Sequence, residues 1–251
     1  MKTKVKTSQE IELMRVSGKM LATVLIFLKN NLSAGMSTKD ISLLAELELK
    51  KIGGLPAFLN YQGFPDVICI SVNNEIVHGI PKKDKIIENG DIISLDFGVN
   101  YQGMITDGAI SVILGEPIKE SHKNLVENTL KSLEAGIGVL KNGVRVGDIS
   151  NAVEGVLNKF NYGIVKDLVG HGVGHYLHED PNIPNYGLKN TGPILQKNMT
   201  IAIEPMATLG TDKIKFSDDG WTVVTADNSL SAHFEHTVLI TQTGFEILTQ
   251  I

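Results

Sequence analysis

The sequence has little cysteine, no long hydrophobic run and no excess of positive charge. Cys69 is the single cysteine among 251 residues, which excludes an internal disulfide and favours a reducing compartment, so we expect a cytoplasmic protein. The apolar stretch 21–28 ends at Lys29, too short to cross a bilayer and poorly built as a secretory signal. A net charge of -5 leaves no basic surface for nucleic acid.

The chain also lacks linkers and low-complexity segments, but it contains an internal repeat. The segment GMSTKDIS (35–42) resembles GVRVGDIS (143–150), and Glu46, Leu49 and Lys51 recur 108 positions later as Glu154, Leu157 and Lys159. In each copy an aspartate precedes an amphipathic run that ends at glycine, which predicts helices over about 40–53 and 148–163. Helical spacing of apolar residues predicts two more helices, over 8–30 and 121–141.

The stretch SLDFGVNYQGMITDG (94–108) predicts a hairpin that carries two aspartates. Apolar residues alternate with small or polar ones over 92–99, turn residues follow at 100–103, and apolar residues resume from Met104. Folding about Tyr101 and Gln102 places Asp96 roughly opposite Asp107, where like charges repel unless something compensates. The alternative is a register shifted by one residue, in which one aspartate faces water.

The repeat extends this acidic pair to the second half of the chain. Adding the offset of 108 to Asp96 gives Glu204, in the strand-like TIAIEPM, and the strand HFEHTVLIT begins with Glu235 where its first-half counterpart begins with Asp107. These halves, about 1–115 and 116–251, predict one α+β domain with helices outside a central, mainly antiparallel sheet and with the acids inside.

Four acids converging in an interior must be protonated or neutralised, and two divalent cations would balance their charge. His171 lies between glycines in VGHGVGHYLHEDP, which permits a close backbone approach, whereas no HExxH zincin motif occurs. Four carboxylates and one imidazole form an oxygen-rich ligand set. Such a set favours Mn, Fe(II) or Co, with Mg or Zn as further options.

The segments NNEIVHGIP, DFGVNYQGMITD, GHGVGHYLHEDP, AIEP and SAHFEHTVLIT together resemble the methionine aminopeptidases of the shorter, type I class. That family has the pita-bread fold, which it shares with creatinase, prolidase and aminopeptidase P. The resemblance runs from Ile11 to the C-terminal strand and implies that Asp96 binds one metal ion, that Asp107 and Glu235 bridge two, and that His171 and Glu204 bind the other. It also implies that His78 and His178 contact the substrate or the tetrahedral intermediate.

The resemblance further implies a methionine pocket and a mechanism. The pocket residues would be Tyr61, Phe64, Cys69 and Trp221, with Phe58 and Leu177 at its edges, and a thioether packs well against such rings. A metal-activated water would attack the peptide, and Glu204 would act as general base and then general acid. Phe64, His175 and Leu177 depart from the commonest type I residues, which concerns the shape of the pocket rather than the ligands.

The expected activity is therefore removal of N-terminal methionine from nascent chains whose second residue is small. Two alternatives remain: a proline-directed peptidase of the same fold, whose GHGVGHYLHEDP motif would look similar, and a catalytically inactive pita-bread module that binds proteins. Relatives of the first kind usually carry an extra N-terminal domain, and those of the second lose metal ligands. We expect a monomer whose ribosome contact is transient, with no binding to membranes or to specific nucleic-acid sequences.

Overall fold

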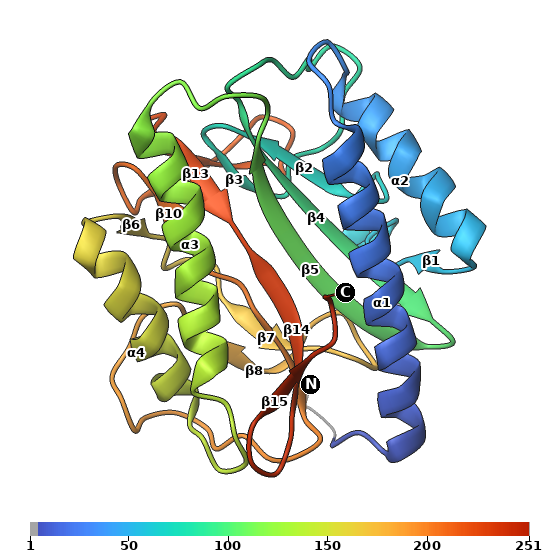
Figure 1. Cartoon of the computed structure of the whole chain (residues 1–251), viewed down its shortest axis with the longest axis vertical. Helices are drawn as coiled ribbons and strands as arrows, with labels where there is room; N and C mark the ends of the chain where they lie inside the picture. Colours follow the sequence, from blue (N-terminus) through green and yellow to red (C-terminus); the bar gives the residue numbers. More distant parts are fainter. Residues whose placement is uncertain (1–4, 251) are drawn as a thin grey trace.

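The computed structural model describes residues 5–250 and contains a curved antiparallel sheet with helices packed along it (Figure 1). The helices of this part are α1 (Ser8–Asn31), α2 (Thr38–Ile52), α3 (Glu120–Gly138) and α4 (Val146–Leu157). The strands are β1 (Leu55–Pro56), β2 (Cys69–Val72), β3 (Glu75–Val77), β4 (Ile92–Tyr101), β5 (Met104–Ile113), β6 (Gly163–Ile164), β7 (Gly170–Gly172), β8 (Glu179–Ile183), β9 (Thr200–Ile203), β10 (Met206–Thr208), β11 (Ile214–Phe216), β12 (Val223–Thr225), β13 (Ser231–His233), β14 (Glu235–Ile240) and β15 (Phe245–Ile247). This arrangement is the α+β architecture that the repeat predicts, and it agrees with the pita-bread fold that the resemblance implies.

The two halves of the chain meet in the middle of the main sheet. Its strand order is β1-β4-β5-β14-β9-β7-β8, so β5 of the first half pairs with β14 of the second. Two short sheets, β13-β10-β6 and β11-β12-β3, flank it. In Figure 1 α1 and α2 cover the first half, whereas α3 and α4 cover the second, and all four lie on the same side of the sheet.

Helix starts follow the capping chemistry of the repeat. Ser37 and Asp40 form a reciprocal capping box at α2, in which the Ser37 hydroxyl accepts from the Asp40 backbone N–H and the Asp40 carboxylate accepts from the Ser37 backbone N–H. At α4 the Asp148 carboxylate accepts from the backbone N–H of Arg145 in the same way. The two aspartates of the repeat, Asp40 and Asp148, therefore stabilise the first turns of α2 and α4.

Backbone hydrogen bonds around these helices recur at the same offset of 108 residues. The bridge between Ser37 and Ile86 is matched by one between Arg145 and Ile194. The Ile87 backbone N–H donates to the Met36 carbonyl, and Leu195 donates to Val144 in the same manner. The sequence repeat therefore corresponds to a repeat of the backbone structure in the two halves.

Three details of the sequence prediction were wrong. The helix expected to end at Gly163 ends at Leu157, because a 3-10 turn follows over 158–160 and Asn161 then takes a left-handed conformation, which asparagine tolerates. The helix expected over 121–141 ends at Gly138. There the Leu140 N–H donates to the Ile137 carbonyl three residues earlier, which is a tighter turn than an α-helix makes. The third concerns the hairpin.

The β4–β5 hairpin turns at Gln102 and Gly103, one residue later than predicted. Both residues have positive φ, 51° and 87°, as a two-residue type I′ turn requires. The register therefore pairs Asp96 with Ala109 and Gly98 with Asp107. The two aspartates are diagonal neighbours on one face rather than directly opposed, so both still point the same way and both are buried.

The core divides between the two helix pairs. One apolar cluster lies beneath α1 and α2 and includes Leu21, Leu28 and Phe97, while another lies beneath α3 and α4 and includes Leu133, Ile149 and Ile203. Because both faces of β4 are buried, the strand and its aspartate are held rigidly. Among the described residues, no helix combines the length and apolar character needed to cross a membrane.

Candidate active site

Residues from both halves line one cavity of about 160 Å³. Its walls include the eleven residues predicted to be catalytic, metal-binding or substrate-binding, namely Tyr61, Phe64, Cys69, His78, Asp96, Asp107, His171, His178, Glu204, Trp221 and Glu235. They also include Phe58 and Leu177, which were expected at the edges of the pocket, and Gln62, which was not predicted. Acids and histidines lie at one end, and aromatic and apolar side chains at the other. The cavity therefore joins an ionisable region to an apolar one.

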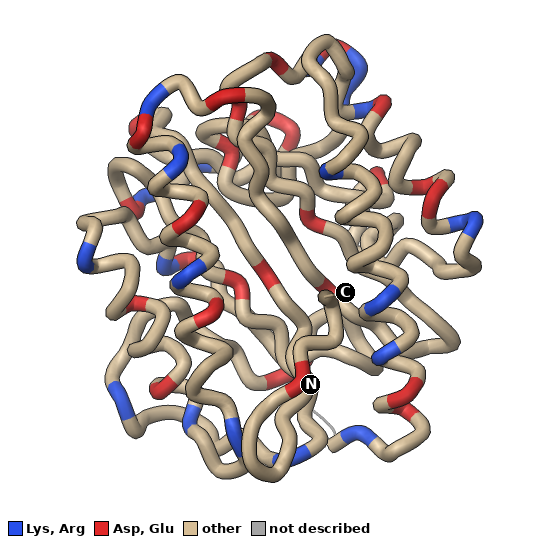
Figure 2. The backbone as a smooth tube through the Cα atoms, viewed as in Figure 1, with Lys and Arg blue, Asp and Glu red and all other residues tan. Residues whose placement is uncertain are grey.

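The acids come from the strands at the centre of the sheet. Asp96 lies in β4, Asp107 in β5 and Glu235 at the start of β14, whereas Glu204 directly follows β9. Figure 2 shows acidic positions along the central strands, whereas the Lys and Arg positions lie mostly on the surrounding helices and loops. The carboxylates therefore meet without a neighbouring lysine or arginine among the residues that line the cavity.

His171 in β7 completes this group. Its Nε2 lies 3.4 Å from Glu204 Oε1 and 3.9 Å from Asp107 Oδ2. Its Nδ1 lies 2.9 Å from the Gly172 carbonyl, which can only accept, so Nδ1 carries the proton and Nε2 presents a lone pair to the acids. A neutral imidazole fixed in this tautomer is a suitable metal ligand.

Burial sets the protonation of these groups. It raises the pKa of Asp96 to about 7 and that of Glu204 to about 8. It also raises the pKa of Asp107, with the Asp96 charge adding to the effect, and the pKa of Glu235, with the Asp107 charge adding. Burial lowers the pKa of His171 to about 3. Without cations the acids therefore hold protons near neutral pH, while the imidazole stays neutral.

Several buried atoms in the cluster lack the partners that a cation would supply. Oδ1 of Asp96 and Oε1 of Glu235 have no hydrogen-bond partner. Ligand atoms of Asp107, His171 and Glu235 lie within 4.8 Å of one another, as do those of Glu204, His233 and Glu235. Buried, unpartnered carboxylate oxygens at such separations fit divalent cations, because an ion would satisfy both their charge and their lone pairs.

His233 is a member of the second group that the sequence interpretation missed. Strand pairing matches Gly98 with Asp107 in the first half and Met206 with His233 in the second, and Met206 is the repeat equivalent of Gly98. The counterpart of Asp107 is therefore His233, not Glu235 as predicted. The sequence does contain His233, but the offset of 108 does not lead to it. The strand that carries Asp107 and the strand that carries His233 are separated by a different offset, because the loops before them differ in length.

The apolar end of the cavity is an aromatic corner. Phe58, Phe64, Cys69 and Leu177 form a buried cluster against which Tyr61 and Trp221 pack. The rings of Phe64 and Trp221 meet edge to face, with centroids 5.2 Å apart. Cys69 pairs with Asp96 across β2 and β4, and burial raises the pKa of its thiol, so it offers an apolar thiol to the pocket.

Tyr61 has a contact that the sequence did not predict. Its hydroxyl lies 2.8 Å from Nδ1 of His178, and the His178 ring meets that of His171 edge-on at 4.3 Å. Burial lowers the pKa of His178. With Tyr61 donating to Nδ1, the neutral ring keeps its proton on Nε2.

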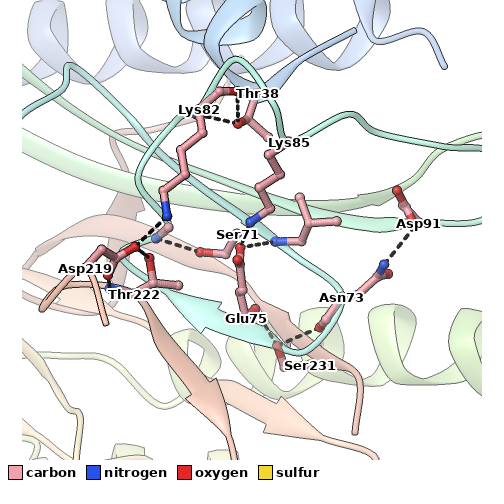
Figure 3. A network of polar contacts seen from close by, with 12 residues as sticks. Thr38, Ser71, Asn73, Glu75, Lys82, Lys85, Asp91, Asp219, Thr222 and Ser231 are labelled. Carbon is pink, nitrogen blue, oxygen red and sulfur yellow. Dashed lines mark hydrogen bonds and ion pairs between the residues drawn. The ribbon is translucent and has the colours of Figure 1, made fainter. Parts of the chain in front are cut away.

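A polar network that includes Ser71, Lys82, Asp219 and Thr222 (Figure 3) contacts the backbone next to His78 and Trp221, which line the cavity. Asp219 accepts from the Trp221 and Thr222 backbone N–H groups at 3.1 and 2.8 Å and pairs with Lys82 at 3.0 Å. The Ser71 hydroxyl accepts from the Gly79 N–H, next to His78, whose φ of 58° places it in the left-handed region. These contacts fix the backbone beside Trp221 and His78.

A buried ion pair ties the N-terminal segment to the loop that carries His178. Lys6 Nζ lies 2.9 Å from Glu179 Oε2, and neither side chain is exposed to solvent. Glu179 Oε1 accepts from the His175 and Tyr176 backbone N–H groups. The His175 side chain, one of the departures from the family pattern, reaches Glu10 of α1 at 2.7 Å. No local pattern in the sequence joins residues so far apart.

Comparisons with known proteins agree with this geometry. The family model of metallopeptidase family M24 matches residues 12–242. Methionine aminopeptidase 1 of Bacillus subtilis is 44% identical over 246 residues, which cover 98% of both chains. The crystal structure of a methionine aminopeptidase from Thermotoga maritima superposes with a TM-score of 0.97 at 44% identity, covering 99% of this chain and 100% of that one.

The prolidase of Pyrococcus furiosus shares the fold, with a TM-score of 0.80 at 23% identity, and this chain covers 65% of its length. The family match therefore extends over nearly the whole chain, and the ionisable cavity lies within the matched residues. This chain belongs to metallopeptidase family M24, whose members bind divalent metal ions.

Proposed function

We propose that this chain is a type I methionine aminopeptidase, with residues 1–251 forming a single catalytic domain. It would remove N-terminal methionine when the second residue is small. The observation that carries the proposal is one cavity in which three buried carboxylates, the partly buried Glu204 and His171 adjoin an aromatic corner. Relatives 40–44% identical to this chain are named methionine aminopeptidases.

Two divalent cations are proposed for the ionisable end. Asp96 would hold one ion, His171 and Glu204 the other, and Asp107 and Glu235 would contact both. Two such cations balance the four carboxylates, and their binding would displace the protons that burial retains on Asp96 and Glu204. The oxygen-rich set favours Mn, Fe(II) or Co, with Zn or Mg as further options.

The chain's own residues would then perform the proton transfers. Bound divalent cations would supply Lewis acidity, which lowers the pKa of a water towards about 7. Glu204, whose carboxylate lines the cavity beside His171, would accept the proton of a water there and return it to the leaving amine. His178, with its Nδ1 held by Tyr61, would donate Nε2–H to the oxygen of the scissile carbonyl.

The substrate would enter with its methionine side chain against Tyr61, Phe64, Cys69 and Trp221. Thioether sulfur packs favourably against aromatic edges, which suits the crossed rings of Phe64 and Trp221. His78, whose ring lies 6.3 Å from that of Trp221, would contact the substrate backbone. The physiological substrate would be a nascent polypeptide in the cytoplasm, met by a monomeric enzyme through a transient ribosome contact.

A peptide assay with metal titration tests the proposal. We expect Met-Ala-Ser to be cleaved by protein reloaded with Mn, Fe(II) or Co, and Glu204→Gln to lower kcat by about 10²–10⁴-fold while the fold persists. A matched control, Glu116→Gln at an exposed loop position, should retain full turnover. Cleavage of an Xaa-Pro peptide alone would assign a proline-directed peptidase. Metal-free, inactive protein at saturating cation would instead indicate a binding module.

A further inference from the structure

His233 is a buried histidine without a hydrogen-bond partner. It ends β13, two residues before Glu235, and only 1% of its surface is exposed. Both of its ring nitrogens are buried and unpaired. A neutral imidazole has one donor and one acceptor, so leaving both unused in an interior is costly unless a partner arrives.

The backbone of His233 is fixed by a hydroxyl from the other half of the chain. Ser111 Oγ donates to the His233 carbonyl at 2.8 Å and accepts from the His233 N–H at 2.9 Å. Thr237 Oγ1 makes the same two contacts with the backbone of Asp107, at 2.7 and 2.9 Å. Asp107 in β5 and His233 in β13 therefore occupy equivalent places in the two halves of the chain.

The His233 ring lies next to the acids. Its Nε2 lies 3.7 Å from Oε2 of Glu204, whereas the other oxygen of Glu204, Oε1, lies 3.4 Å from Nε2 of His171. Glu204 thus has an imidazole beside each oxygen. The lining of the cavity includes Glu204 and His171 but not His233, so His233 lies behind the carboxylate and His171 in front of it.

We propose that His233 is a positioning residue of the metal centre, whose Nε2–H holds Oε2 of Glu204 so that Oε1 faces the cavity beside His171. This inference rests on the proposed function, because Glu204 needs a fixed orientation only when it binds a cation and transfers a proton. A movement of about 0.8 Å would bring Nε2 and Oε2 to hydrogen-bond distance. Ligating carboxylates are commonly held by such outer partners, whose loss typically costs about 10–100-fold in metal affinity.

The competing role is that of a direct ligand. The ligand atoms of Glu204, His233 and Glu235 lie within 4.8 Å of one another, which is close enough to share an ion. A positioning residue and a ligand differ in what they do to the ion itself. Loss of a positioning residue lowers the affinity for the ion but leaves its coordination sphere intact, whereas loss of a ligand changes both.

Metal binding measured by calorimetry, with Mn²⁺ alone as the probe, tests the proposal. His233→Gln keeps an N–H donor and should bind Mn²⁺ within a few-fold of the wild type. His233→Leu keeps bulk but not the donor and should bind about 10–100-fold more weakly. His122→Leu on α3 removes another histidine with an unpaired nitrogen, far from the acids in the sequence, and should leave affinity unchanged. Mn²⁺ affinity unchanged in His233→Leu would overturn the inference.

Two spectroscopic readouts identify the role directly. The visible absorption of the Co²⁺-loaded protein should be the same for wild type and His233→Gln, whereas a changed band would mean that His233 is a ligand and would refute positioning. In wild-type protein loaded with Zn²⁺, ¹⁵N NMR of labelled histidine should find Nε2 of His233 protonated. This measurement uses no variant, so it tests the inference even if His233→Leu fails to fold. A metal-bound Nε2 would refute the inference. If the wild type binds no divalent cation, the proposed function fails first.

Discussion

In the metal-free protein the buried carboxyls should contribute a stability that falls as pH rises, whereas the buried histidines, whose pKa burial lowers, contribute one that rises up to about pH 6.5. In the folded, metal-free state burial raises the pKa of Asp96 from 3.8 to about 7, so the folded protein keeps a proton that the unfolded chain releases. A carboxyl of this kind favours the folded state below its folded pKa and loses that contribution as pH rises from about 4 to about 7. Glu204 acts in the same direction, because burial raises its pKa to about 8.

The magnitude follows from proton linkage. Each proton held only by the folded state changes the free energy of unfolding by about 1.4 kcal/mol per pH unit, so Asp96 alone should cost about 2 to 3 kcal/mol between pH 5 and pH 7. That is a large share of the roughly 5 to 15 kcal/mol that stabilises a typical domain. Urea unfolding of chelator-treated wild type and Asp96→Asn at several pH values measures this slope as the difference between the two proteins. Saturating Mn²⁺ should abolish it, since the ions replace the protons.

Matched variants make the test specific. Asp96→Asn removes the titrating group and should reduce the slope by about 1.4 kcal/mol per pH unit, while the exposed Glu116→Gln should leave it unchanged. An equal pH slope in metal-free wild type and Asp96→Asn would refute the reasoning, because the histidines are common to both proteins and the result would mean that Asp96 is not protonated in the folded state.

Two further predictions concern contacts that the sequence did not reveal. Lys6→Met leaves Glu179 buried without its cation and should lower the free energy of unfolding by about 3 to 5 kcal/mol; Lys6→Met with Glu179→Gln should recover much of that, and equal losses in single and double variants would contradict the account. Tyr61→Phe removes the partner of His178 Nδ1 and should lower kcat about fivefold, in line with about 1 kcal/mol for one hydrogen bond, with the unfolding midpoint little changed. A change in KM alone would mean that Tyr61 only lines the pocket.

The central hairpin shows what the sequence could and could not predict. Alternating apolar residues identified β4 and β5, and the face shared by Asp96 and Asp107 followed from the period of two. The register did not follow, because the positive φ values at Gln102 and Gly103 move the turn by one residue, and glutamine gives no strong signal for that conformation. The predicted register paired Asp96 with Asp107 rather than with Ala109, a shift of two residues. Because side chains alternate with a period of two, Asp96 and Asp107 still lie on the same face of the hairpin.

Long-range partners were beyond the sequence for a different reason. The repeat offset located Glu204 from Asp96, because the segments between the helix starts and the strands have equal length in both halves. It could not locate His233, whose strand follows loops of unequal length, nor the pairing of Lys6 with Glu179, which no periodicity connects. Burial of charged partners becomes visible only when the tertiary structure places them together.

The claim that acids from both halves gather two cations is tested by anomalous diffraction from crystals of Mn²⁺-loaded protein. We predict two peaks roughly 3.5 to 4 Å apart in the cavity, both within bonding distance of Asp107 and Glu235. An empty cavity at saturating Mn²⁺, or peaks confined to carboxylates on the outer surface, would contradict it.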